Sequence, residues 1–243
     1  MSGLAQLADY VRKSRSADLP AHQRAHLRRH IADAGVALVA GAHSPEGASL
    51  LALSDGDDWT EAAATAAGVI RSTEVDDIHL GSCTTPTSVA MPAALLIGAQ
   101  PSPEAAEDAI RIGVELMVRL GLAIHGPEVL YKGVWPTCFS TPLGVAAVAA
   151  RLWGLGEEAT VNALSMALMV SSGRTGRFNG TPTGRWVLLR CAVQNGLRAA
   201  HAARKGYKGD PSLLDGEWLK NAQGLDADRL DALDRKALVQ ESD

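Results

Sequence analysis

Residues 132–209 read KGVWPTCFSTPLGVAAVAARLWGLGEEATVNALSMALMVSSGRTGRFNGTPTGRWVLLRCAVQNGLRAAHAARKGYKG. Three apolar, alanine-rich segments with helical periodicity alternate here with two loops rich in Gly, Thr, Pro and Arg. Small side chains let helix backbones approach one another closely, so the segments predict tightly packed helices. The loops between them predict polar groups held at the edge of that packed body.

The remaining segments extend the same helical pattern. Ser102 followed by Pro103 is typical of a helix start, and Gly126 with Pro127 predicts where that helix stops. No alternating pattern is long enough to indicate a strand, and the short apolar run 48–53 indicates neither type. The sequence therefore predicts an all-α fold, with one helical domain over residues 1–209 and a polar tail with short helices over residues 210–243. Helices are expected at residues 3–15, 19–42, 59–71, 88–99, 102–124, 142–155, 157–169 and 185–204.

Composition and charge narrow the class of protein. The chain has 243 residues, of which 47% are apolar and 4% aromatic, enough for one sizeable core of Ala, Leu and Val. A net charge of -4 argues against binding to nucleic acid or acidic membranes. Three cysteines, an odd number, indicate reduced thiols in a cytoplasmic protein. The first helical segment has no apolar core of the signal-peptide type, and the sequence has no run of eighteen apolar residues, so no membrane span is expected.

Three ordered segments resemble the MmgE/PrpD family. EVDDIHLGSCTTPTSVAMPAAL is similar to its D-F-D-D-T…H-P-S…P-A-L segment. GVWPTCFSTPLGVAAVAARLWGLGEEATVNALSMA is similar to its G-x-H-P-T segment and the alanine-rich helix that follows. NGTPTGRWVLLRCAVQNGLRAAHAARKGYKG is similar to its G-T-x-T-K segment. The resemblance covers most of residues 19–210 and implies the family's helical domain, without the smaller α/β lid domain that follows in members of about twice this length.

The resemblance also implies a chemistry. The family includes 2-methylcitrate dehydratase, cis-aconitate decarboxylase and iminodisuccinate epimerase, which move a proton next to a carboxylate without a metal or other cofactor. The family's first functional carboxylate falls on Glu74, and its acidic companions fall on Asp76 and Asp77. Three carboxylates in four residues repel one another, so one of them is expected to keep a raised pKa and act as acid or base. The alternative is a solvated acidic loop or helix cap.

Several positions depart from the family pattern. Its H-P-S histidine falls on Thr85, its H-P-T histidine on Trp135, its lysine on Gly184 beside Arg185, and a later histidine on Val187. Groups that would move protons or hold a carboxylate are therefore missing from their expected places. Either the ancestral reaction is lost, or the protein handles a different substrate.

Histidines elsewhere are candidates to replace the missing base. His79 lies in the acidic loop, and an imidazole titrates near neutral pH, although an isolated loop histidine is more often a surface residue. His22, His26 and His30 recur every four residues on one helix face. That spacing suits a metal, but a basic solvated face is the favoured interpretation, so no metal site is predicted.

Two cysteines and one lysine lie near the motifs. Cys83 or Cys138 would need a neighbouring base or cation to form a thiolate, and small buried packing is the favoured interpretation. Cys83, Thr85 and Asp76 are included among the substrate-binding candidates because they lie in the first motif. Lys132 precedes the Trp135 loop and is placed to clamp an acid group.

Arg174, Arg177 and Arg185 are the best candidates for anion binding. Their loop, SSGRTGRFNGTPTGR, offers guanidinium forks and backbone N–H groups that suit a carboxylate or phosphate. It lacks the order of a phosphate-binding Walker loop, and a merely exposed basic loop is the alternative. Trp135 stands where the family has histidine, so a larger and more apolar side chain is expected in the wall of the pocket.

The sequence favours an enzyme, a cofactor-independent lyase or isomerase that acts on an altered small organic acid. Glu74, Asp77 and His79 are expected to move protons, and the arginines to hold the anionic group. The alternatives are an apolar pocket that catalyses a cyclisation or rearrangement in secondary metabolism, and a non-catalytic binding protein. The expected partners are a small-molecule substrate and a second copy of the chain, since exposed apolar helix faces favour a homodimer.

Overall fold

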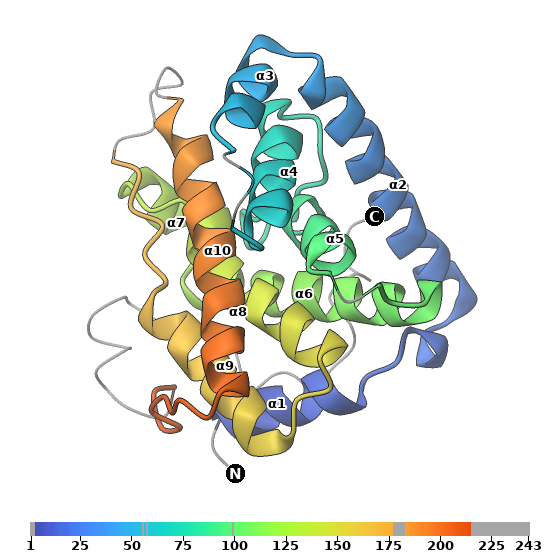
Figure 1. Cartoon of the computed structure of the whole chain (residues 1–243), viewed down its shortest axis with the longest axis vertical. Coiled ribbons are helices and arrows are strands. Elements are labelled where there is room, and N and C mark those ends of the chain that lie inside the picture. The colour runs from blue at the N-terminus through green and yellow to red at the C-terminus, as the bar shows by residue number, and fades with distance from the viewer. Residues whose placement is uncertain (1–2, 55, 57, 99, 177–182, 215–243) are drawn as a thin grey trace.

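A computed structural model describes residues 3–54, 56, 58–98, 100–176 and 183–214 (Figure 1). Within these residues every regular element is helical, which confirms the all-α prediction. None of the helices in these ranges is both long and apolar enough to cross a bilayer. The α-helices are α1 (Gly3–Lys13), α2 (Ala21–Ala42), α3 (Pro45–Ala52), α4 (Glu61–Ser72), α5 (Thr87–Leu96), α6 (Pro103–Ala123), α7 (Gly126–Tyr131), α8 (Pro136–Leu152), α9 (Glu157–Met169) and α10 (Gly184–Arg204).

Helix α8 lies at the centre of the bundle. It packs against α6, α10, α9 and α5, and it is buried from Pro136 to Ala150. In Figure 1, α10 runs along the long axis, α4 packs beside it, α5 packs against α4, and α2 forms the outer edge. One apolar cluster joins α1, α6, α8 and α9, and it includes the buried Leu213 and Leu214. Packing therefore continues beyond residue 209, where the polar tail is expected to begin.

Glycines permit the closest helix contacts in this core. A Cβ atom on Gly144 of α8 would lie 2.9 Å from the carbonyl oxygen of Gly113 on α6. On another side of α8, a Cβ atom on Gly196 of α10 would lie 2.6 Å from the carbonyl oxygen of Pro142. Both separations are too short for an unstrained carbon–oxygen contact. The backbones therefore approach as closely as the small-residue composition predicts.

Two helix starts show the expected capping chemistry. The Ser102 hydroxyl accepts the backbone N–H of Ala105 at 3.2 Å, which confirms the helix start predicted at that serine. The Ser44 hydroxyl accepts the backbone N–H of Gly47 at 3.0 Å, and Pro45 follows the cap in α3. The ambiguous apolar run is therefore helical, because a cap four residues upstream starts the helix.

Two prolines occupy helix positions that the sequence did not indicate. Helix α6 ends at Ala123, which confirms the predicted end, but Pro127 together with Gly126 opens a further helix, α7, directly after His125 adopts a left-handed φ of 54°. Helix α8 begins at Pro136, so that Pro142 lies inside the helix instead of starting it. A proline in the first turn loses no helical hydrogen bond, and the burial of α8 outweighs the break that Pro142 would cause in an isolated helix.

Candidate functional site

An acidic loop between α4 and α5 carries the predicted catalytic residues. It spans residues 73–86 and closes on itself where His79 donates its backbone N–H to the Thr84 carbonyl at 2.8 Å. Glu74 and Cys83 have φ values of 53° and 55°, a conformation that side-chain-bearing residues usually avoid. Such strain costs about 1–3 kcal/mol and persists only where the surroundings hold it. The contacts around the loop therefore impose its shape.

The beginning of this loop meets the beginning of α10. Glu74 Oε1 lies 2.7 Å from Arg185 Nη2, and the glutamate side chain is 50% exposed whereas that of the arginine is 16% exposed. The guanidinium carbon of Arg185 also lies 4.1 Å from the centre of the Trp186 ring. The fold thus brings two loops that are distant in sequence together at a charged pair that reaches solvent.

Two indoles and a second arginine lie beside this pair. Trp135, which precedes α8, and Trp186 are 5.8 Å apart between ring centres, with their rings inclined at 74°. The Arg71 guanidinium lies 5.7 Å from the first ring and 5.6 Å from the second. These contacts bring the segment that carries Trp135 to the acidic loop and to the start of α10. We call the whole group the arginine–tryptophan cluster; it comprises Arg71, Glu74, Asp76, Trp135, Arg185 and Trp186.

Asp76 is enclosed within this cluster by its ion pair with Arg71. Its side chain is inaccessible to solvent, and burial raises the pKa of its carboxyl, an effect that the Arg71 charge opposes. Within the described ranges, Asp76 Oδ2 has no hydrogen-bond partner. Removing one partner of a buried pair costs about 3–5 kcal/mol, because the other charge is left uncompensated. Asp76 is therefore turned toward Arg71 and away from solvent.

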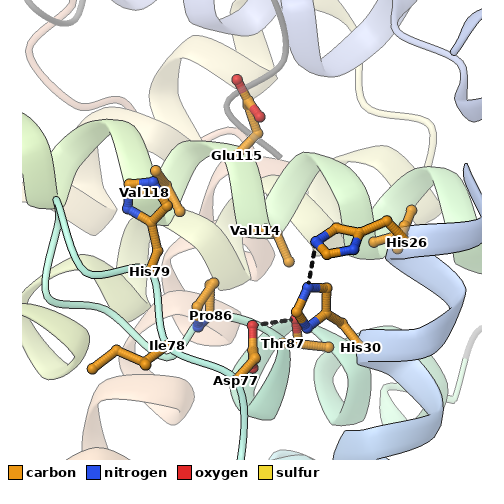
Figure 2. Close-up of a pocket in the computed structure, with 11 residues that line it drawn as sticks. His26, His30, Asp77, Ile78, His79, Pro86, Thr87, Val114, Glu115 and Val118 are labelled. Atoms are coloured by element: carbon orange, nitrogen blue, oxygen red, sulfur yellow. Dashed lines mark hydrogen bonds between the residues drawn. The ribbon is translucent and has the colours of Figure 1, made fainter. Parts of the chain in front are cut away.

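The other side of the acidic loop faces a small cavity (Figure 2). Asp77 and His79 line it together with His26 and His30 of α2, and its volume is about 40 Å³. Thr87, at the start of α5, and valines of α6 complete the wall. A space of this size holds water but no organic acid.

Asp77 has a strongly perturbed carboxyl group. Burial raises its pKa to about 7, and the charges of Asp76 and Asp33 act in the same direction. The Thr87 hydroxyl donates to Asp77 Oδ2 at 2.8 Å and opposes the shift, whereas the buried Oδ1 has no hydrogen-bond partner among the residues described. A carboxyl that titrates near neutral pH is suited both to give and to take a proton.

His79 is oriented by its own loop. The backbone N–H of Ser82 donates to His79 Nδ1 at 3.1 Å, and the Ser82 hydroxyl lies 2.9 Å from the same atom. Because Nδ1 accepts the backbone hydrogen, the neutral ring carries its own hydrogen on Nε2. His79 and Asp77 therefore reach one cavity, whereas Glu74 belongs to the arginine–tryptophan cluster on the other side.

Three further candidates are wholly or partly buried. Thr85 is buried, donates its backbone N–H to Thr137 Oγ1 at 3.1 Å, and so ties the acidic loop to α8. Burial raises the pKa of the Cys83 thiol, and it raises the pKa of Cys138 to about 12. Both thiols are therefore held protonated at neutral pH, which favours the packing interpretation over a thiolate nucleophile.

The remaining cationic candidates lie in the segment before α8 and in the segment after α9. Trp135 donates its backbone N–H to the Gly173 carbonyl at 2.8 Å, so the segment after α9 runs against the start of α8. Arg174 follows directly and is exposed, as is Lys132 at the end of α7. Arg177 lies outside the described residues.

Sequence reasoning misses Arg71 and places His26 and His30 on a solvated face. Arg71 could have been noticed in the sequence as the one cationic residue in the last turn of a largely apolar helix. His26 and His30 are half-buried because the acidic loop and α6 pack over them, whereas His22 on the same helix is exposed. Across the described ranges, no group of three His, Cys, Asp or Glu side chains is placed to hold a metal ion.

Similarity to known proteins agrees with this architecture. Residues 5–231 match the MmgE/PrpD N-terminal domain. A cis-aconitate decarboxylase-like protein, oryM of Aspergillus oryzae (strain ATCC 42149 / RIB 40), is 26% identical over 242 aligned residues. That alignment covers 87% of this chain and 48% of the relative, so the chain spans about half the length of the curated protein it matches. The family match extends over nearly all of the sequence, and the chain therefore belongs to the MmgE/PrpD family.

Proposed function

We propose that this chain is a lyase or isomerase that moves a proton next to a carboxylate of a small organic acid. The observation that carries the proposal is the pair formed by Glu74 and Arg185, 2.7 Å apart at a solvent-reaching edge. A carboxylate is a base, and a guanidinium is the side chain best shaped to bind a carboxylate. The cis-aconitate decarboxylase-like relative supports an acid of this class.

The residues take distinct roles in this proposal. A substrate carboxylate displaces Glu74 from Arg185, which frees Glu74 to remove the neighbouring proton. Asp77 and His79, which line the cavity on the other side of the same loop, carry the proton in the transfers that follow. Arg174, Arg177 and Lys132 are the further cations that can hold a second acid group. Removing a proton next to a carboxylate needs a base and charge stabilisation, so the proposal invokes no cofactor.

The test is hydrogen exchange, because it does not depend on the final product. The chain is incubated in D2O with cis-aconitate, 2-methylcitrate and related di- and tricarboxylates, and deuterium incorporation and product formation are followed by NMR. Glu74→Gln is expected to slow exchange about 100-fold or more, and Arg185→Gln to raise KM. Glu104→Gln, an exposed acid at the start of α6, is the matched control and is expected to change neither value.

Two results would overturn the proposal. One is wild-type protein that exchanges hydrogen with none of these acids. The other is exchange that continues at the wild-type rate in both Glu74→Gln and Arg185→Gln, since the charged pair would then have no part in the chemistry.

A second candidate function rests on a groove beside Trp186. Trp186 lines a groove of about 290 Å³ between α3 and the start of α10, which Leu50, Leu53 and Val187 make largely apolar. A space of this size approaches that of small-molecule sites. It favours a pocket that promotes a cyclisation or rearrangement of a less polar metabolite, or that binds one without changing it.

Substitutions at Trp135 and Glu74 separate the two candidates. Trp135→Ala removes the ring that faces Trp186 and is expected to abolish turnover of a less polar substrate, whereas Glu74→Gln leaves it unchanged. The opposite pattern supports the organic-acid enzyme. Binding without turnover, lost in Trp135→Ala, identifies a binding protein.

A further inference from the structure

Two histidines meet across one turn of α2. His26 Nε2 and His30 Nε2 are 2.8 Å apart, and the rings stand nearly perpendicular with centres 4.3 Å apart (Figure 2). A hydrogen bond between two imidazole nitrogens needs one N–H donor and one bare acceptor. The neutral pair is therefore held by a single hydrogen. Both rings line the cavity that Asp77 also lines.

The neighbouring Arg29 decides which ring donates. Its Nη2 lies 3.4 Å from His26 Nδ1, and a guanidinium donates hydrogens but never accepts them. His26 Nδ1 is thus the bare nitrogen, so the hydrogen of His26 lies on Nε2 and points to His30 Nε2. Since His30 accepts at Nε2, its own hydrogen lies on Nδ1. The hydrogen bonds therefore all point the same way: Arg29 donates to His26, His26 donates to His30, and His30 has its own N–H at Nδ1.

The surroundings of His30 disfavour its charged form. Burial lowers the pKa of His30, and the neighbouring His26 and Arg29 act in the same direction, whereas Asp33 opposes them. A further proton placed on His30 Nε2 would break the hydrogen bond, because both Nε2 atoms would then be donors.

Groups on the other elements face the pair from across the cavity. The acidic loop contributes Asp77 and His79, and α6 contributes Glu115. Figure 2 shows the Glu115 carboxylate directed away from the histidines, and Arg119 Nε donates to it at 2.8 Å. His79 accepts a hydrogen at Nδ1 from Ser82. The buried Asp77 Oδ1 has no hydrogen bond among the residues described. Because the Glu115 carboxylate is directed away from the histidines, Asp77 is the acid of the cavity wall that the pair can serve.

We propose that His26 and His30 form a proton relay that connects solvent to the Asp77 carboxyl across this cavity. The proton on His30 Nδ1 passes to ionised Asp77, directly or through one water molecule, for which the cavity has room. At the same time the proton on His26 Nε2 passes to His30 Nε2, and His26 Nδ1, once Arg29 Nη2 has moved off it, takes a proton from a hydronium ion or a buffer acid in the solvent. One proton enters from solvent and one reaches Asp77. The reverse sequence returns it.

The relay supplies imidazole groups that the motif loops lack. Thr85 and Trp135 stand where the family resemblance expects histidines, and α2 brings two others to the inner side of the acidic loop. His26 and His30 are positioning residues here, because they act on a substrate only through Asp77. Their role in catalysis rests on the function proposed above, whereas the proton path itself does not.

The first test needs no substrate. Nitrogen-15 NMR of the imidazoles in the intact chain is expected to show His26 protonated at Nε2 and His30 at Nδ1 near pH 7. The carbon-13 signal of the Asp77 carboxyl is then followed through its titration. Wild type and His22→Gln, an exposed histidine one turn earlier on α2, are expected to give one averaged signal. His30→Gln, which cannot pass a proton, is expected to give two separate signals because exchange with solvent becomes slow.

The second test asks whether the relay serves the reaction. With an acid that the wild type turns over, His30→Gln is expected to lower kcat about 10-fold or more with KM within about twofold. Added imidazole buffer is expected to restore the rate, which a purely structural loss would not allow. His22→Gln is again the matched control.

These outcomes separate the two proposals. His30 protonated at Nε2, or an Asp77 signal that stays averaged in His30→Gln, overturns the relay. A kcat in His30→Gln that does not fall, or that buffer does not restore, removes its role in catalysis. The expected NMR results together with no turnover of any acid leave the relay in place and overturn the proposed function.

Discussion

Asp76 and Asp77 are neighbours in sequence and lie in different surroundings. Asp76 faces the arginine–tryptophan cluster and is paired with Arg71, whereas Asp77 faces the histidine cavity. The sequence predicts a raised pKa from repulsion among three carboxylates. The pKa of Asp77 is indeed raised, to about 7, but burial is the largest cause and the charge of Asp76 is a smaller one. The environment of each side chain therefore sets its acidity more than its spacing does.

Asp77→Asn is expected to change how stability depends on pH. The folded pKa of Asp77, about 7, lies above the ordinary value of 3.8, so between these values the folded state binds more protons than the unfolded state. Stability from this group is therefore present at low pH and is lost as pH rises through about 7. Relative to wild type, the variant should gain roughly 2–4 kcal/mol between pH 4 and pH 8. Urea unfolding at both pH values measures this, and parallel curves would contradict it.

At the scale of the helices, α8 organises the core through close contact with its neighbours. Gly144 of α8 lets α6 approach its backbone, and Gly196 of α10 lets α10 approach the α8 backbone at Pro142. The same approach places the start of α8 beside the start of α10, where Trp135 and Trp186 meet. Tight helix packing and the formation of the candidate site are therefore two results of one interface.

Gly196→Ala and Gly35→Ala form a matched pair that tests this packing. A Cβ atom at position 196 would lie 2.6 Å from the Pro142 carbonyl oxygen, so the substitution is expected to cost about 1–3 kcal/mol. At position 35 of α2 a Cβ atom meets nothing within 4 Å, and alanine should stabilise the protein by about 0.4–1 kcal/mol. Chemical denaturation measures both, and equal effects of the two substitutions would rule out the close contact.

At the scale of the whole molecule, the outer edge of the bundle carries exposed apolar side chains. Val36 and Val39 of α2 are 68% and 62% exposed. Leu51 of the adjoining α3 and Leu53, which caps its end, are 47% and 55% exposed. Apolar surface gathered in this way favours association. The homodimer expected from the sequence stays a prediction, as does the cytoplasmic location, and this edge is where we expect the second copy to bind.

Light scattering tests the oligomeric state directly. Wild type is expected at twice the chain mass of 25.4 kDa, and the Val36→Glu/Val39→Glu variant at the chain mass, because charge at the contact must be desolvated. Tyr207→Glu, a change at an exposed residue beyond α10, should leave the dimer intact. A wild-type protein found only as a monomer would contradict the prediction.

The amino-acid pattern was sufficient for the helical class, the family and most helix positions. Periodicity, caps such as Ser102 and the three ordered segments are local or contiguous features, and each can be recognised without knowing what packs against it. The end of α6 before Pro127 could be predicted, but the new helix α7 that starts there and the start of α8 ahead of Pro142 could not, because the turn at His125 and the burial of α8 outweigh the usual behaviour of proline.

The candidate site depended on tertiary structure much more strongly. The sequence indicates Glu74, Asp77, His79 and Arg185, but only folding shows that Glu74 pairs with Arg185 while Asp77 shares a cavity with His26 and His30. Arg71 is not distinguished by any motif, and it acquires its role from Asp76 and two indoles that distant segments deliver. Charge interaction and desolvation act over a few ångströms in space, and the chain order of the residues does not contain those distances.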